Sequence, residues 1–199
     1  KHLTKVEILK AARQLLKKNG YDGVTMRKIA AMLNCQSPTL YYYFKNKDEL
    51  IGALIIEGHK ILAAQIKKDT TSIEDQAKKY EMILRSIIDF AFRYSGYYHI
   101  MFSQDYKNVN LSEALNEGWN HFMEILDEME VIFRDAGFLK TTNTTLVRAY
   151  SIAMIHGAIS MIRNHHTYSA FSNEDLIDSV IAVLMHSYQY PIMNQLAKK

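Results

Sequence analysis

One stretch of the chain, residues 25–47, gathers side chains that bind anionic ligands. Lysine and arginine supply positive charge, and hydroxyl groups donate hydrogen bonds to phosphate oxygens. A guanidinium group can also bind the O6 and N7 atoms of guanine through two parallel hydrogen bonds. The candidate contact residues are Thr25, Arg27, Lys28, Ser37, Pro38, Thr39, Tyr41, Tyr42, Tyr43, Lys45 and Lys47. This set fits the binding of a polyanion, and its residues form no catalytic constellation.

An amphipathic helix is predicted before this stretch. Its inward face is predicted from four apolar residues at helical spacing, Val6, Leu9, Ala12 and Leu16. Asn19-Gly20 ends this helix, because glycine is the usual residue just past a helix end.

Two short helices then carry the candidate contact residues. Thr25 is a good N-cap for a helix over residues 26–33, with Ile29, Ala30 and Leu33 facing inward. Residues 34–36 form the turn. Ser37 then caps a third helix that runs from Pro38 to about Phe44, since proline suits the first helical position. Two short helices joined by a tight turn place a recognition helix in the major groove of DNA.

The charges and tyrosines of this helix-turn-helix agree with a DNA ligand. Arg27 and Lys28 lie in the first turn of their helix, where the helix dipole disfavours cations and an external anion would relieve the conflict. The three tyrosines 41–43 cannot all point inward, so at least one hydroxyl faces solvent or a phosphate. Lys45 and Lys47 follow at the start of a fourth helix, which the Asn46/Glu49 pattern caps.

The window resembles the DNA-binding domain of the TetR family of bacterial transcriptional regulators. The resemblance lies in ILKAARQLLKKNGYDGVT, RKIAAML and SPTLYYYFKNKDEL and covers about the first 55 residues. Ser37-Pro38 departs from the sequence common in the family at this point. The preference of family members for particular DNA bases is therefore not transferred to this chain. The segment MIHG, residues 154–157, resembles the WHG-type C-terminal domain of some members, with methionine where that name has tryptophan.

Composition and charge limit the classes of protein to which the chain can belong. Residues 1–50 contain ten Lys or Arg and four Asp or Glu, whereas residues 51–199 contain fourteen and seventeen. A basic N-terminal part followed by a slightly acidic remainder is typical of a DNA-binding protein that has a separate second function. The longest apolar run is six residues, so no membrane span is expected. The single cysteine, Cys35, indicates a reducing, cytoplasmic location and forms no internal disulfide.

The remainder of the chain is predicted to be helical. The expected helices cover residues 47 to beyond 60, 74–94, 111–136, 144–164 and 174–190, with a short aromatic segment at 97–104 and a polar loop at 105–110. Nowhere does a period-two pattern persist, so no sheet is expected. We predict an all-α protein of about nine helices, with a helix-turn-helix DNA-binding domain over residues 1–46 and a helical ligand-binding and dimerisation domain over residues 47–199.

The last two helices are apolar over much of their surface. The apolar residues are Ile152, Ile155, Ala158 and Ile159 in one, and Leu176, Ile177, Val180, Ile181, Leu184 and Met185 in the other. A helix with so broad an apolar face needs cover on more than one side, either within the subunit or from a partner. The resemblance implies that these helices pair with their copies in a homodimer, which would double the contacts with a palindromic operator.

The middle of the chain is rich in aromatic residues and methionine, which suit an adaptable apolar pocket or a plain core. The resemblance favours a pocket. Its candidate wall and polar groups are Tyr94, Tyr98, His99, Phe102, Trp119, Phe122, Met123, Met154 and His156. The expected effector is a small apolar or aromatic molecule.

We therefore predict a ligand-responsive, dimeric transcriptional regulator, most simply a repressor, that is not an enzyme and needs no cofactor. The alternative is a DNA-binding regulator without a small-molecule ligand, controlled by a protein partner or by its level. No HxxxH pair or cysteine cluster indicates a metal site. Cys35 is interpreted as a small packing residue of the turn, with a thiol sensor as the other reading.

Overall fold

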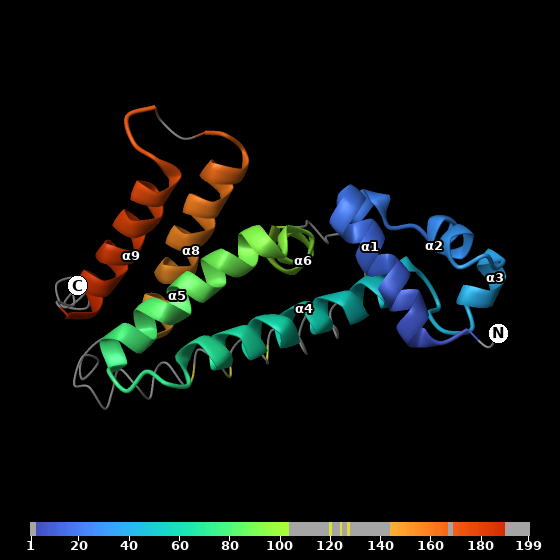
Figure 1. Cartoon of the computed structure of the whole chain (residues 1–199), viewed down its shortest axis with the longest axis horizontal. Coiled ribbons are helices and arrows are strands. Elements are labelled where there is room, and N and C mark those ends of the chain that lie inside the picture. Colours follow the sequence, from blue (N-terminus) through green and yellow to red (C-terminus); the bar gives the residue numbers. More distant parts are fainter. Residues whose placement is uncertain are drawn as a thin grey trace. The chain divides into compact units, whose positions relative to one another are not determined.

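The computed structural model describes residues 3–103, 120, 124, 127, 144–166 and 169–189, and these residues form helices and connecting turns with no strand. The elements are α1 (Lys5–Gly23), α2 (Met26–Met32), α3 (Ser37–Leu40), α4 (Lys47–Thr70), α5 (Gln76–Arg93), α6 (Ser95–Tyr98), the π-helix η1 (His99–Ser103), α8 (Thr144–Arg163) and α9 (Asn173–Gln189) (Figure 1). Of the predicted helix 111–136, only Asn120, Glu124 and Asp127 are described, and all three are helical. The predicted loop 105–110 lies outside the described residues.

The described chain packs as two compact units. The first holds residues 3–64, 90–103 and 120, and the second holds residues 65–89, 124, 127, 144–166 and 169–189. Residues 47–64 therefore pack with the helix-turn-helix. The predicted functional boundary at 46/47 stays a prediction. Among the described helices, none combines the length and the apolar character that a membrane crossing needs.

Helix α1 begins with a capping box. The Thr4 side chain accepts a hydrogen bond from the Glu7 N–H at 3.2 Å, and the Glu7 carboxylate accepts one from the Thr4 N–H at 3.0 Å. The prediction that Val6 faces inward is wrong, because its side chain is 69% exposed. The buried face consists of Ile8, Ala11, Ala12, Leu15 and Leu16. Two residues along a helix turn by about 200°, so Val6 points away from Ile8.

The predicted end of the first helix is confirmed at Gly20. Its φ of 65° lies in the left-handed region, which glycine adopts without strain. The chain then makes one more turn to Gly23 before α2 begins. The predicted cap of α2 is also confirmed, since the Thr25 side chain accepts a hydrogen bond from the Lys28 N–H at 3.2 Å. Ile29 and Ala30 of α2 are buried as expected, and Met26 joins them.

Helix α3 is shorter than predicted. Ser37 is its first helical residue and Gln36 occupies the cap position without a side-chain hydrogen bond, so the prediction of a Ser37 cap is wrong. The helix ends at Leu40 rather than near Phe44. Hydrogen bonds from the Tyr41 N–H to the Pro38 carbonyl and from the Tyr43 N–H to the Leu40 carbonyl continue it as tight turns. Three successive tyrosines favour this ending, because aromatic side chains lose rotamer freedom in a helix.

The start of α4 is only partly as predicted. The Asn46 side chain accepts a hydrogen bond from the Glu49 N–H at 2.8 Å, but the Glu49 carboxylate binds the Lys45 N–H at 2.6 Å rather than that of Asn46. The cap therefore spans one residue more than a capping box. In its first turns, α4 buries Leu50, Ile51, Leu54 and Ile55 completely.

Helix α6 lies against α1 at Gly96. A Cβ atom added there would lie 3.0 Å from both the Cγ atom and the carbonyl oxygen of Leu16. The Leu16 backbone cannot retreat without bending α1. Gly96 therefore sets the distance between these two helices.

Replacing Gly96 with alanine is expected to lower the free energy of unfolding by about 1–3 kcal/mol, the usual cost of overpacking. The matched control is Gly157→Ala in α8, where the added Cβ would meet nothing within 4 Å. There, better helix propensity is expected to raise stability by up to about 1 kcal/mol. Urea unfolding followed by circular dichroism measures both. Equal effects of the two variants would contradict the close approach of α6 to α1.

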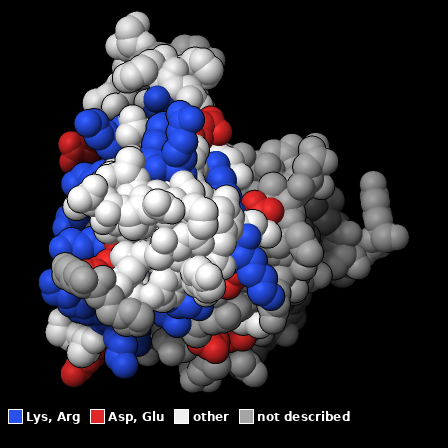
Figure 2. Space-filling view, turned by 90° about the vertical axis from the view of Figure 1, so that its right-hand side faces the viewer, with Lys and Arg blue, Asp and Glu red and all other residues white. Residues whose placement is uncertain are grey.

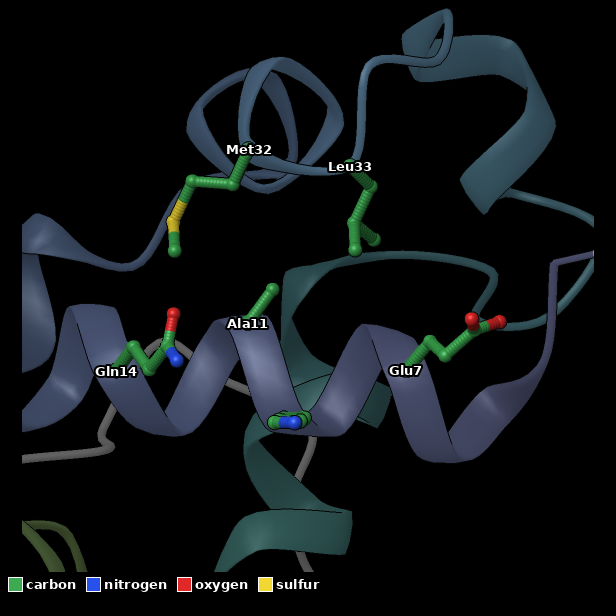
Figure 3. Close-up of a pocket in the computed structure, with 6 residues that line it drawn as sticks. Glu7, Ala11, Gln14, Met32 and Leu33 are labelled. Carbon is green, nitrogen blue, oxygen red and sulfur yellow. The ribbon is translucent and has the colours of Figure 1, made fainter.

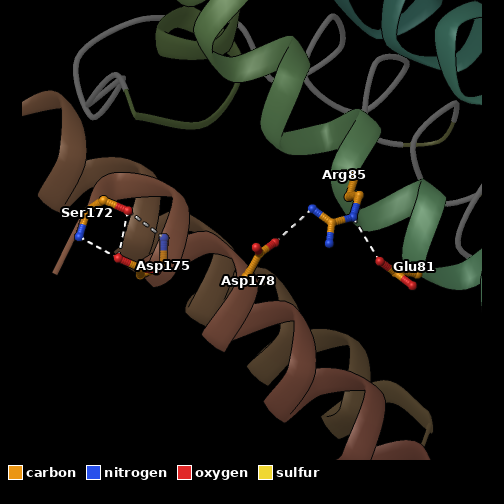
Figure 4. A network of polar contacts seen from close by, with 5 residues as sticks. All are labelled: Glu81, Arg85, Ser172, Asp175 and Asp178. Atoms are coloured by element: carbon orange, nitrogen blue, oxygen red, sulfur yellow. Dashed lines mark hydrogen bonds and ion pairs between the residues drawn. The ribbon is translucent and has the colours of Figure 1, made fainter.

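In the second unit, Arg85 of α5 joins α9 through polar contacts (Figure 4). The Arg85 side chain lies 2.9 Å from the Glu81 carboxylate and 3.0 Å from that of Asp178. These groups are well exposed, so each pair adds little stability. The predicted start of α9 is confirmed, since Ser172 and Asp175 form reciprocal hydrogen bonds of 2.7 Å and 3.1 Å.

Candidate nucleic-acid interface

The first turn of α2 presents two cations to solvent. Arg27 and Lys28 are both exposed, and this turn carries no acidic residue. The Thr25 hydroxyl oxygen accepts a hydrogen bond from the Lys28 N–H. The proton of the Thr25 hydroxyl can still be donated to a ligand. This arrangement combines positive charge with hydrogen-bond donors, as a phosphate group requires.

The turn after α3 presents aromatic side chains to solvent. Tyr42 is 89% exposed and Tyr41 is 50% exposed, which confirms that the three tyrosines are not all inward. Pro38 is exposed, and Ser37 and Thr39 are half-buried. Leu40 is fully buried and anchors the segment to the domain. Both Tyr41 and Tyr42 can therefore donate to an external acceptor.

Tyr43 and Lys47 are both engaged within the domain. The Tyr43 hydroxyl donates to the Leu3 carbonyl oxygen. The Lys47 ammonium donates to the Tyr21 carbonyl oxygen at 3.1 Å and lies 3.7 Å from the centre of the Tyr21 ring. Burial lowers the pKa of Lys47, against the opposing charges of Asp22 and Asp48. Lys47 is thus a half-buried cation that ties α4 to the end of α1.

Positive charge gathers at the end of the first unit that carries α2 and α3. Figure 2 shows lysine and arginine side chains around an uncharged patch, with only a few acidic side chains between them. Lys45 is exposed just before α4, and its own N–H is bound by the Glu49 carboxylate. The face therefore has cations at its edge and uncharged groups at its centre. This distribution suits a groove of DNA, where phosphates line the edges and bases lie between them.

A groove of about 240 Å³ lies between α1 and the end of α2 (Figure 3). It is lined by Glu7, Lys10, Ala11, Gln14, Met32 and Leu33. Met32 and Leu33 point toward α1, and Gln14 and Ala11 point back toward them. The groove shares no residue with the predicted effector site.

Part of the predicted effector site forms an aromatic cluster in the first unit. The ring centres of Tyr98 and Phe102 are 5.1 Å apart, and those of Phe90 and Tyr94 are 5.3 Å apart. Tyr98 is buried, and Tyr94, Phe102 and His99 are half-buried. Met154 and His156 lie half-buried on α8 of the second unit, and Trp119, Phe122 and Met123 lie outside the described residues.

Sequence reasoning missed a histidine beside this cluster. His59 of α4 is only 3% exposed, and its ring centre is 5.7 Å from that of Phe102. Its Nδ1 atom is 2.9 Å from the Ile55 carbonyl, which can only accept, so Nδ1 carries the proton. No local pattern marks His59, because its burial depends on η1, some forty residues later in the chain.

A polar chain that the sequence did not reveal joins α1, α4 and α6. The Tyr97 hydroxyl donates to the Glu57 carboxylate at 3.0 Å, and that carboxylate lies 3.5 Å from the Arg13 guanidinium. Burial, and then the charge of Glu57, raises the pKa of Tyr97, so the hydroxyl stays protonated. These contacts fix the aromatic segment to the helix that leads into the helix-turn-helix.

His156 predicts a pH dependence of stability. Burial lowers its pKa below the ordinary value of 6.5, so the folded protein takes up a proton less readily than the unfolded chain. The contribution of neutral His156 to the free energy of unfolding is complete above about pH 6.5. It is lost as the pH falls toward the pKa that His156 has in the folded protein. Urea unfolding is measured at about pH 7.5, 6.5 and 5.5. The free energy of unfolding should therefore fall less with decreasing pH in His156→Gln than in the wild type. Exposed His166 supplies the control substitution, His166→Gln, and an equal fall in His156→Gln and the wild type would contradict the expectation.

The first unit matches proteins of known class. Residues 8–54 match the family model described as "Bacterial regulatory proteins, tetR family". The tetracycline repressor protein class D of Escherichia coli is 44% identical over 55 residues, which cover 28% of this chain and 25% of that repressor. The matched part thus spans about a quarter of the length of the tetracycline repressors.

Two other proteins are similar over more of the chain. The HTH-type transcriptional regulator QacR of Staphylococcus aureus (strain Mu50 / ATCC 700699) is 25% identical over 133 residues, 66% of this chain and 69% of QacR. The crystal structure of the transcriptional regulator FadR from Bacillus subtilis in complex with stearoyl-CoA has a TM-score of 0.73 at 20% identity. It covers 92% of this chain and 98% of that chain. The likeness shows that the fold extends beyond the N-terminal match.

Proposed function

Because the chain belongs to the tetR family of bacterial regulatory proteins, we propose that it is a homodimeric repressor that binds a palindromic operator and is released by a small, largely apolar effector. The observation that carries the proposal is the face built by α2, α3 and the following turn. There, Arg27, Lys28, Tyr42 and Lys45 are exposed, and Leu40 is a fully buried anchor. Nothing in this arrangement performs catalysis.

On this proposal, α3 and the turn after it enter the major groove. Arg27 reaches a guanine, since its side chain is exposed and has the planar fork that guanine O6 and N7 require. Thr39 and Tyr41 border the bases. The hydroxyls of Thr25 and Tyr42 and the ammonium groups of Lys28 and Lys45 bind phosphates and set the register.

The proposed dimer uses α8 and α9. Val183 of α9 is 53% exposed, and Leu176, Ile177 and Val180 are half-buried. Covering these apolar side chains with a second copy is favourable by about 25 cal/mol for each Å² removed from water. A two-fold dimer also matches a palindrome, with half-sites one turn of DNA apart.

The proposed effector binds at the aromatic cluster. Tyr94, Tyr98 and Phe102 supply an apolar wall, and His59 and His99 supply polar groups beside it. For Trp119, Phe122, Met123, Met154 and His156, a role in effector binding stays a prediction from the sequence. Because the FadR neighbour was crystallised with stearoyl-CoA, acyl-CoA thioesters are the first class to test.

Release from the operator requires two conformational states of the protein. An effector shifts the equilibrium only if its affinity differs between the state that fits the operator and the state that does not. The contacts of Tyr97 with Glu57 and of Glu57 with Arg13 connect the helix that carries Tyr97 and Tyr98 to α1. Through them, a change at the aromatic cluster can move α1. The alternative is a regulator without a small-molecule ligand, controlled by a protein partner or by its level.

Footprinting on the DNA upstream of its own gene tests the proposal. Protection of two symmetric half-sites about 10 base pairs apart is expected. Acyl-CoA thioesters of short, medium and long chains are then added, and loss of protection with one length class is the predicted response. Protection without symmetry would contradict the dimer. Protection that no thioester removes would leave the regulator without this effector class.

A further inference from the structure

The start of α1 is held beside the end of the recognition segment by two contacts. The Tyr43 hydroxyl donates to the Leu3 carbonyl oxygen. The Lys5 ammonium lies 5.3 Å from the centre of the Phe44 ring, within the range of a cation–π contact. Figure 1 shows the N-terminal end of α1 on the same side of the unit as α3. These contacts join residues about forty positions apart in the chain.

The Tyr43 contact decides what this tyrosine can do for DNA. A phenol has one proton, and both carbonyl and phosphate oxygens only accept hydrogen bonds. While the proton is donated to Leu3, it cannot be donated to a phosphate. Tyr42, which is 89% exposed, has no such engagement among the contacts of the described residues. The two neighbouring tyrosines therefore have different roles.

Lys5 is the charged group that this contact positions. Its side chain is exposed, and it lies over Phe44, which directly precedes the exposed Lys45. It also occupies the first turn of α1, where the helix dipole disfavours a cation and an anionic ligand would be favoured. The Glu7 carboxylate in the same turn accepts hydrogen bonds from the N–H and the hydroxyl of Thr4. The ammonium of Lys5 thus adds to the positive edge of the DNA-facing surface.

We propose that Lys5 is an additional phosphate contact and that Tyr43 is the positioning residue that holds it in place through Leu3. The proposal rests on the proposed DNA-binding function of this face. It assigns Tyr43 a role within the protein, in place of the direct contact with DNA predicted from the sequence.

The salt dependence of operator affinity distinguishes the two roles of Tyr43. Each phosphate that a cation neutralises adds about 0.9 to the slope of log affinity against log salt. Lys5→Ala is expected to reduce this slope by about one per protomer. Tyr43→Phe removes an uncharged hydroxyl. It is nevertheless expected to reduce the slope toward the Lys5→Ala value and to weaken binding by about 3-fold to 10-fold.

A double-mutant cycle completes the test. If Tyr43 acts through Lys5, then Tyr43→Phe has little further effect in the Lys5→Ala background. Tyr42→Phe is the matched control, because it removes the same hydroxyl from an exposed tyrosine. It is expected to weaken binding with no change of slope and to add to Lys5→Ala. Thermal unfolding of each variant confirms that the domain is folded at the temperature of the titrations.

Two results would overturn the proposal in distinguishable ways. If Tyr43→Phe weakens binding at an unchanged slope and adds to Lys5→Ala, Tyr43 contacts the phosphate directly and only this inference fails. If the wild type shows no preference for any upstream duplex, the proposed function fails and this inference fails with it.

Discussion

Alanine in place of Arg27 is expected to weaken operator binding by at least about 30-fold. One bidentate contact with guanine contributes about 1–3 kcal/mol, and a two-fold symmetric complex loses it twice. The folded domain should not suffer, because Arg27 is exposed and Thr25 still caps α2. Removing a cation from the first turn of a helix should even stabilise α2 slightly. Titration of labelled operator duplex with the variant measures the loss.

The control for Arg27→Ala is Lys67→Ala, an exposed residue in the last turn of α4. Both variants remove one positive charge, so a general electrostatic effect would weaken binding equally in both. A base contact predicts loss in Arg27→Ala alone, together with relaxed preference at one base pair of each half-site. Equal losses in the two variants would show that Arg27 contributes charge only.

The second large effect is expected at Leu40. Its side chain is fully buried, and truncation to alanine leaves a cavity that costs about 2–5 kcal/mol of unfolding free energy. Because Leu40 ends α3, this cavity loosens the recognition segment itself. Urea unfolding of Leu40→Ala should show the loss of stability, and operator titration should show weaker binding.

Tyr42→Ala separates folding from binding at the neighbouring turn. Tyr42 is 89% exposed, so its truncation should change stability by no more than about 0.5 kcal/mol. It should still weaken operator binding through the lost hydroxyl. A Leu40→Ala variant as stable as Tyr42→Ala would contradict the buried position of Leu40.

Features that depend on nearby residues could be predicted from the sequence. Thr25 and the Ser172/Asp175 pair bind N–H groups three residues away, so the pattern and the contact lie in one segment. Gly20 interrupts α1, as predicted for the end of the first helix, because only its own backbone has to turn. The short spacing between Tyr98 and Phe102 likewise places these two rings together.

Features that depend on distant residues could not be predicted. Val6 and Ile8 are both apolar, and only the packing of α1 decides that Ile8 is buried and Val6 is exposed. The Tyr43–Leu3 contact and the burial of His59 each join segments about forty residues apart. Ser37 is a good capping residue, yet α3 begins at Ser37 itself and Gln36 takes the cap position without a side-chain hydrogen bond. A capping pattern in the sequence locates a helix start only to within one or two residues.

The most direct test of the DNA-binding account is fluorescence anisotropy with two duplexes at about 150 mM salt, where non-specific binding is weak. One duplex is the region immediately upstream of the gene, and the other is its scrambled sequence. The account predicts preference for the upstream duplex by on the order of a thousandfold or more. Arg27→Ala is expected to reduce that preference by at least about 30-fold, and Lys67→Ala is expected to leave it unchanged. Equal, weak binding of the wild type to both duplexes would contradict an operator-binding repressor of its own gene.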